Sequence, residues 1–136
     1  MDYLTLKEKY KNIADVKENN QYGNLCFYLQ NLILKLIKNK HQEFIDYIYL
    51  CCLECLKISS KYKNATYTVH VYLENVTMKQ FSLSLFKKMN KQLEEKLDEE
   101  VLNTCYVYNA TNITKKIFYI ISPFLNKDTK SKIVLY

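Results

Sequence analysis

The sequence has no tryptophan and no arginine, and it has a single glycine, Gly23, and a single proline, Pro123. So little glycine and proline excludes collagen-like and linker-like chains. Proteins that read DNA sequence depend on arginine for bidentate contacts to guanine. The absence of arginine therefore argues against a nucleic-acid partner, although the net charge is +6. The excess of lysine, asparagine, isoleucine and tyrosine is typical of an AT-rich genome, so the lysine content alone indicates no function.

The sequence also lacks a run of about 20 apolar residues, which a transmembrane helix requires. Its N-terminus, MDYLTLKEK, contains no apolar stretch of the kind found in signal peptides. We therefore expect a cytoplasmic protein. A length of 136 residues, 49% apolar and 25% charged, is typical of one globular domain with one core. The domain is expected to span residues 1–136.

The sequence has an odd number of cysteines, five: Cys26, Cys51, Cys52, Cys55 and Cys105. Cys52 and Cys55 form a Cys-x-x-Cys pair, but the two histidines, His41 and His70, add no second ligand pair at a zinc-like spacing. The pair also falls inside an apolar helical pattern, whereas a thioredoxin-like redox pair follows a strand at a helix N-terminus. We therefore expect free thiols, no metal ion and no cofactor.

The sequence contains none of the residue patterns that carry catalysis. A glycine-rich phosphate loop, a metal-ligand set and a nucleophile elbow are all missing. His70 falls in a segment with strand-like alternation, where a lone histidine is usually a hydrogen-bonded structural residue rather than a general base. The expected function is therefore not enzymatic.

The first half of the chain is expected to be largely helical. Residues 24–39 carry a wide apolar stripe that ends among lysines, as a helix C-terminus prefers, although residues 24–30 also fit a strand. Apolar residues spaced by three and four predict a helix over residues 43–58. Residues 1–22 are polar and fit either an edge strand or a short helix.

The second half alternates between strands and helices. Tyr67–Leu73 alternates, with apolar groups on each face, which predicts a strand that is covered on both sides. Thr77 and Gln80 form a capping-box pattern that predicts a helix from residue 78 to about 98. The remaining expected elements are a strand at 102–109, a helix at 113–125 capped by Thr111 or Asn112, and a strand at 132–136. This βαβαβ order predicts an α/β fold with a mostly parallel sheet.

Residues 109–133, NATNITKKIFYIISPFLNKDTKSKI, resemble the C-terminal motif of CRAL-TRIO (Sec14-like) lipid-binding domains. In that family an Asn-Ala-Pro-like turn precedes a helix, which finishes in a Pro-Phe-Leu element before a Lys-Thr turn and a final strand. The matching residues are Asn109, Ala110, Pro123, Phe124, Leu125, Thr129, Lys132 and Ile133. The resemblance covers residues 67–136, and it reaches the first half only through the order of elements.

The resemblance implies a single CRAL-TRIO-like domain with helices packed on the sheet. It implies a phospholipid or phosphoinositide in an apolar pocket that helix 113–125 gates. The residues expected at the pocket or gate are Ile117, Phe118, Ile121, Phe124 and Leu125. The residues expected to meet a lipid headgroup or an anionic membrane surface are Lys115, Lys116, Lys127, Lys130 and Lys132.

The sequence departs from the family pattern in ways that favour a second hypothesis. Thr111 replaces the usual proline, and the chain has neither the helical N-terminal module nor the C-terminal continuation of typical members. These features are similar to the compact branch that includes neurofibromin and the Cdc42GAP-type modules. Some members of that branch bind small GTPases, so the alternative is a protein-interaction scaffold without a lipid pocket. A homodimer stays open in either case, because an incomplete sheet edge needs cover.

Overall fold

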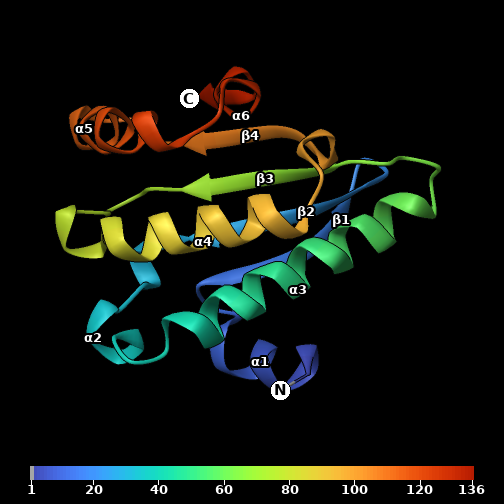
Figure 1. Ribbon diagram of the computed structural model, residues 1–136, viewed down its shortest axis with the longest axis horizontal. Coiled ribbons are helices and arrows are strands. Elements are labelled where there is room, and N and C mark those ends of the chain that lie inside the picture. The colour runs from blue at the N-terminus through green and yellow to red at the C-terminus, as the bar shows by residue number, and fades with distance from the viewer. Residues whose placement is uncertain (1) are drawn as a thin grey trace.

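The computed structural model describes residues 2–136, apart from the side chains of Leu36 and Glu99. A sheet of order β1-β2-β3-β4-β5 forms its centre (Figure 1). β1 pairs with β2 in antiparallel fashion, and the other neighbours are parallel. The prediction of an α/β fold with a mostly parallel sheet is therefore confirmed. The strands are β1 (Ala14–Asn19), β2 (Tyr22–Tyr28), β3 (Tyr67–Tyr72), β4 (Leu102–Tyr108) and β5 (Ile133–Leu135).

Helices connect the strands and begin the chain. The α-helices are α1 (Tyr3–Tyr10), α2 (Leu34–Ile37), α3 (His41–Ser60), α4 (Leu83–Lys96), α5 (Asn112–Ile121) and α6 (Lys127–Ser131). Single 3-10 turns lie between them at η1 (Leu29–Asn31), η2 (Met78–Gln80), η3 (Glu99–Val101) and η4 (Ser122–Phe124). The predicted βαβαβ order of the second half is confirmed, with α6 added where a turn was expected.

The helix predicted over residues 24–39 is wrong in its first part, where β2 lies instead. The strand alternative for residues 24–30 is the correct one. A short apolar run fits a buried strand as well as a buried helix, and the pairing of β2 with β1 and β3 decides between them. For residues 1–22 both alternatives occur, because α1 is followed by β1.

The helix predicted from residue 78 begins only at Leu83. The capping box of Thr77 and Gln80 does form, but it closes the single turn η2. Phe81 then adopts an extended conformation, and Ser82 starts α4 by accepting a hydrogen bond from the Leu85 amide. α4 ends at Lys96, before the acidic run is complete, in keeping with the cost of acids at a helix C-terminus.

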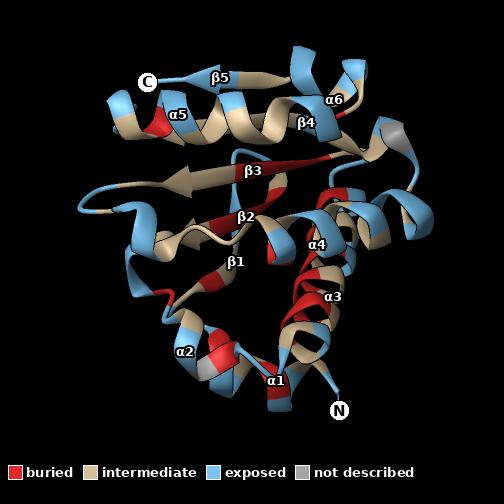
Figure 2. Cartoon of the chain, turned by 60° about the vertical axis from the view of Figure 1, so that its left-hand side comes forward, coloured by how far each residue is buried: buried red, intermediate tan, exposed pale blue. Residues whose placement is uncertain are grey.

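One face of the sheet carries aliphatic and aromatic side chains and supports the helices. The strand registers align Phe27 with Val71, Val71 with Val107, and Val107 with Leu135 across the sheet. A parallel row joins Leu25, Val69, Cys105 and Ile133. Most of the buried residues lie on α1, α3, β2 and β3, which meet on this face (Figure 2).

The opposite face carries a row of aromatic rings, which we call the tyrosine ladder: Tyr28, Tyr72, Tyr108 and Tyr136. Neighbouring rings in the ladder stack with centroids 5.3, 4.8 and 5.5 Å apart. These spacings follow the distance of about 4.8 Å between paired strands. Tyr28, Tyr72 and Tyr108 are half-buried and Tyr136 is 64% exposed. The second face of β3 is buried at Thr68, which is 6% exposed, and half-buried at Tyr72. That β3 is covered on both sides stays a prediction.

The glycine Gly23 lets α3 pack directly against β2. A Cβ atom at this position would lie 2.1 Å from the carbonyl oxygen of Cys55 and 2.4 Å from its Cα. The Gly23 amide also donates a hydrogen bond of 2.8 Å to the Oγ of Ser59, which is fully buried. Backbone therefore meets backbone here, and no flexible side chain is available to move aside.

We predict that Gly23→Ala lowers the free energy of unfolding by at least about 2 kcal/mol, since α3 must move away from β2. Without this contact the change would stabilise a strand, because glycine is the costlier residue there. Urea denaturation monitored by circular dichroism measures the difference. The matched control is Asn103→Ala on the exposed side of β4, for which we expect a change within about 0.5 kcal/mol. Equal stability of the two variants would contradict the prediction.

Candidate functional site

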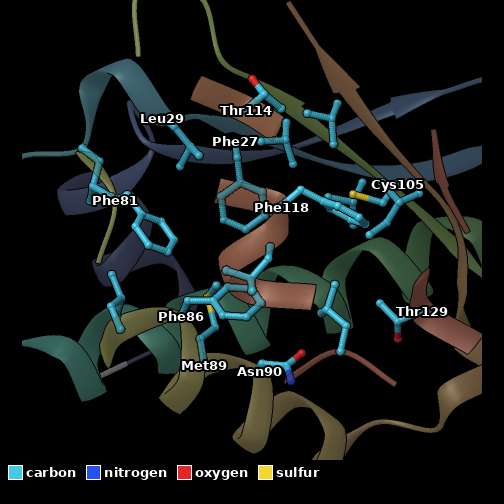
Figure 3. Close-up of a pocket in the computed structure, with 18 of the residues that line it drawn as sticks. Phe27, Leu29, Phe81, Phe86, Met89, Asn90, Cys105, Thr114, Phe118 and Thr129 are labelled. Atoms are coloured by element: carbon cyan, nitrogen blue, oxygen red, sulfur yellow. The ribbon is translucent and has the colours of Figure 1, made fainter. Parts of the chain in front are cut away.

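A cavity of about 320 Å³ lies between the helix-bearing face of the sheet and helices α4 and α5 (Figure 3). Its floor is the row of Phe27, Val71, Val107 and Leu135, which the strand registers place side by side. Because alternate residues of a strand share a face, this one row brings four strands to the cavity. The floor is therefore built by the sheet itself and not by a single loop.

Helix α4 forms one wall of the cavity. Leu85, Phe86 and Met89 line it, at the three- and four-residue spacing that places side chains on one side of a helix. Phe81, in the extended link between η2 and α4, adds an aromatic ring at one end. The break between η2 and α4 therefore places Phe81 and Phe86 on the same cavity.

Helix α5 forms the other wall through Thr114, Phe118 and Ile121. Thr111 caps this helix, because its hydroxyl oxygen accepts from the Thr114 amide while the Thr114 hydroxyl oxygen accepts from the Thr111 amide at 3.1 Å. Thr114 is 5% exposed. Thr111, the residue that departs from the family pattern, thus fixes the first turn of the cavity wall.

The segment after α5 is attached to α4. The Asn90 Nδ2 atom donates to the Phe124 carbonyl oxygen at 3.0 Å, and the Asn126 Nδ2 atom donates to the Glu94 carboxylate at 3.3 Å. The Lys87 ammonium lies 4.6 Å from the centroid of the Phe124 ring. These contacts hold the two walls together at the end of α5, whereas the Phe81 end has no such link among the contacts described.

Three of the five residues expected at a pocket or gate line the cavity: Phe118, Ile121 and Leu125. Ile117 is half-buried elsewhere on α5, one residue and about 100° around the helix from Phe118. Phe124 is 41% exposed and packs against Lys87, because α5 ends before Pro123 and η4 turns the chain. The apolar residues of the expected helix thus continue to Leu125, but the helical geometry that would align them on one side ends at Ile121.

The five lysines expected to meet a headgroup lie outside the cavity. Lys115 and Lys116 line a shallow hollow on the outer side of α5, together with Met78, Tyr119 and Ile120. Lys127 and Lys130 are exposed, and Lys132 lies 3.0 Å from Asp128. The structure therefore brings Lys115 and Lys116 together near α5 and places the others around α6.

Sequence reasoning missed the sheet and α4 contributions to the cavity, among them Phe27, Val71, Phe81, Phe86 and Val107. The signal that points to Phe27 is the two-residue alternation of Leu25 and Phe27, which becomes informative only once the segment is taken as a strand. Phe81 and Phe86 both fall within residues 78–98, where the sequence predicts one helix. Nothing in the sequence separates a stripe that packs tightly from one that faces a space.

His70 lies on the other side of the sheet, away from the cavity. Its Nδ1 atom is 2.7 Å from the Tyr108 hydroxyl, and its Nε2 atom is 2.8 Å from the Asn24 Oδ1. The Asn24 amide nitrogen donates to backbone carbonyls, including that of Tyr22, so its oxygen faces the ring and Nε2 carries the proton. Burial lowers the pKa of His70. Both ring nitrogens are thus engaged in holding the sheet.

The cysteines are free thiols in the hydrophobic interior, and Cys105 is the one that lines the cavity. Burial raises the pKa of Cys52 and of Cys105 to about 11, and that of Cys51 to about 12. Such thiols are almost entirely protonated at neutral pH and are poor nucleophiles and ligands. Among the residues that the structure describes, no cluster of three histidine, cysteine or acidic residues is placed to hold a metal ion.

Comparison with known proteins gives both a family and a fold. A family model described as the CRAL/TRIO domain matches residues 8–136. The crystal structure of Sfh5 superposes with a TM-score of 0.78 at 15% sequence identity, over 94% of this chain and 48% of the Sfh5 chain. The present chain thus spans about half the length of that structure. No curated protein matches the sequence. None of the helices in the described residues has the length and apolar character to cross a membrane.

We predict that stability falls as the pH drops below 6.5, the ordinary pKa of histidine. The unfolded chain takes up a proton on His70 near that pH, whereas the folded chain does so only at lower pH, so folding loses free energy in the interval between them. For one proton the slope is at most about 1.4 kcal/mol per pH unit. Urea denaturation at pH 7.5 and 5.5 measures it. His70→Gln should reduce the dependence, and an unchanged dependence in this variant would contradict the assignment.

We also predict that Cys105 is the first thiol to react with N-ethylmaleimide in the native protein, because it is half-buried at the cavity while the other four are buried. Its raised pKa makes even this reaction slow at pH 8. Peptide mass spectrometry at successive times gives the order of labelling. Labelling of Cys52 or Cys55 at the same rate as Cys105 would show that the core opens as a whole.

Proposed function

The chain belongs to the CRAL/TRIO domain family, and from that premise we propose that it is a non-enzymatic lipid-binding module. In this proposal the cavity between the sheet, α4 and α5 holds the apolar part of the lipid. The observation that carries the proposal is the cavity itself. An apolar space of about 320 Å³ in the folded protein is at the lower end of the range of about 300–1,000 Å³ for small-molecule sites.

The lining of the cavity supports an apolar occupant. Side chains such as Phe27, Val107 and Phe118 offer carbon surface from three separate elements. Each methylene that leaves water for such a space gains about 0.8 kcal/mol. An acyl chain therefore gains several kcal/mol here without any polar contact, and α5 is the element whose movement opens the way in.

The outer side of α5 supports contact with an anionic membrane surface. Lys115 and Lys116 stand beside the exposed side chains of Met78 and Tyr119, which are 44% and 83% exposed. A lysine near an anionic membrane contributes about 1 kcal/mol, and an amphipathic tyrosine suits the headgroup region. The proposal therefore includes a cytoplasmic protein that meets membranes at their surface and takes a lipid from them. The family resemblance alone implies a phospholipid or phosphoinositide.

The test is to fill the cavity. Val107→Phe adds a ring to the centre of the floor, and we expect it to weaken binding of lipid at least ten-fold with the fold retained. Purified protein is incubated with vesicles of mixed lipid, re-isolated, and examined by native mass spectrometry and lipid extraction. The matched control is Val134→Phe on the neighbouring strand β5, where the side chain faces away from the cavity and is 39% exposed.

Three outcomes have distinct meanings. Lipid bound by the wild type and by Val134→Phe but not by Val107→Phe supports the proposal. Absence of lipid from all three proteins argues against it. Equal lipid on all three would mean that the lipid adheres to the surface, which also argues against a cavity site. Protection of Cys105 from N-ethylmaleimide by bound lipid is a further sign of cavity occupancy.

The tyrosine ladder favours the second candidate, a protein-interaction scaffold of the same fold. Tyrosine is enriched at protein interfaces, because it provides rigid contact area and a hydroxyl at little entropic cost. Tyr72 and Tyr108 are half-buried and their hydroxyl-bearing edges lie on the face that carries no cavity. Recovery of a stable partner, such as a small GTPase, by wild type but not by Tyr72→Ala would support this role. The two roles use opposite faces of the sheet.

A further inference from the structure

The cavity is uncharged throughout its described lining. Among the described residues that face it, none carries an acidic or basic side chain. The polar side chains that line it are all neutral: the Tyr67 hydroxyl, the Cys105 thiol, and the side chains of Gln80, Ser82, Asn90, Thr114 and Thr129. A lining of this kind restricts the charge of the ligand as well as its polarity.

The neutral polar groups at the cavity are largely occupied by the protein's own backbone. Gln80 accepts hydrogen bonds at its Oε1 atom from Thr77, and the Ser82 hydroxyl oxygen accepts from the Leu85 amide. Asn90 donates to the Phe124 carbonyl. What remains for a ligand is a small number of uncharged donors and acceptors at the cavity ends, suited to a hydroxyl, an ester or a carbonyl.

The lysines of α4 and α5, the two helical walls, do not line the cavity. The Lys87 ammonium lies over the ring of Phe124, which is 41% exposed and does not line the cavity. Lys115 and Lys116 line the outer hollow with Tyr119. A phosphate or carboxylate inside the cavity would therefore lose its hydration without gaining a cation, and an unpaired buried charge costs far more than the apolar chain gains.

We infer that the cavity takes an uncharged lipid, with an apolar body and a hydroxyl, ester or carbonyl end, in place of the phosphate-bearing lipid that the family resemblance implies. The inference rests on the proposed function, because it names the ligand class of the same site. The small volume of the cavity agrees with one apolar chain and no large headgroup. Lys115 and Lys116, on the outer side of α5, then bind the anionic surface of the membrane from which the lipid is taken.

The experiment compares lipids that share one oleoyl or oleyl chain and differ in the charge of the head. Oleyl alcohol and monoolein are neutral, whereas oleate and oleoyl lysophosphatidic acid are anions at pH 8. Displacement of a fluorescent fatty alcohol from the full chain gives relative affinities. We expect both neutral lipids to bind at least ten-fold more tightly than both anions. Anions that bind equally or more tightly would overturn the inference while leaving lipid binding intact. Binding of none of the four would instead overturn the proposed function.

A charge placed in the cavity gives a second test. Met89→Lys exchanges one long unbranched side chain for another and places an ammonium on the α4 wall (Figure 3). We expect the ten-fold preference for neutral lipids to vanish or reverse. Met78→Lys adds the same charge on the outer side of the molecule, where Met78 is 44% exposed, and should keep the preference. A reversal by Met78→Lys would mean that surface charge, and not the cavity, sets the selection. If Met89→Lys does not fold, the wild-type comparison alone still decides the question.

Discussion

The structure depends on how closely each helix approaches the sheet. At Gly23 no side chain of β2 separates the strand from α3, and the two backbones meet there. Helices α4 and α5 reach the same face only through large side chains such as Met89 and Phe118, which leaves a space in front of β3, β4 and β5. The cavity is therefore the result of one tight and two loose contacts on a single face.

The chemistry of the molecule is divided in the same way. Thiols and carbon surface occupy the interior, where burial keeps Cys51 and Cys52 protonated. Hydrogen-bonded aromatic residues, with His70 and Tyr108 at their centre, occupy the second face of the sheet. The lysines stay outside. Such a division suits a protein that binds by exclusion of water.

The sequence predicts the second half of the fold well because its signals are local. Thr111 caps α5 as expected, and the alternation at Tyr67–Leu73 marks β3. The first half depends on pairing, which no local pattern reveals, so β2 resembled the start of a helix. For the site, Phe118, Ile121 and Leu125 share one stripe and could be found, whereas Phe27 and Phe86 reach the cavity only through tertiary packing. Membership of the compact branch that includes neurofibromin stays a prediction.

The tyrosine ladder has an optical consequence. Because the sequence contains no tryptophan and 13 tyrosines, its near-ultraviolet absorption and emission come from phenol rings. The rings of Tyr28, Tyr72 and Tyr108 stand nearly parallel, within 9° and 12° of their neighbours, so their transition dipoles couple across three strands. The near-ultraviolet circular dichroism of these tyrosines therefore depends on the pairing of the strands. It reports on the side of the sheet that a ligand in the cavity does not contact.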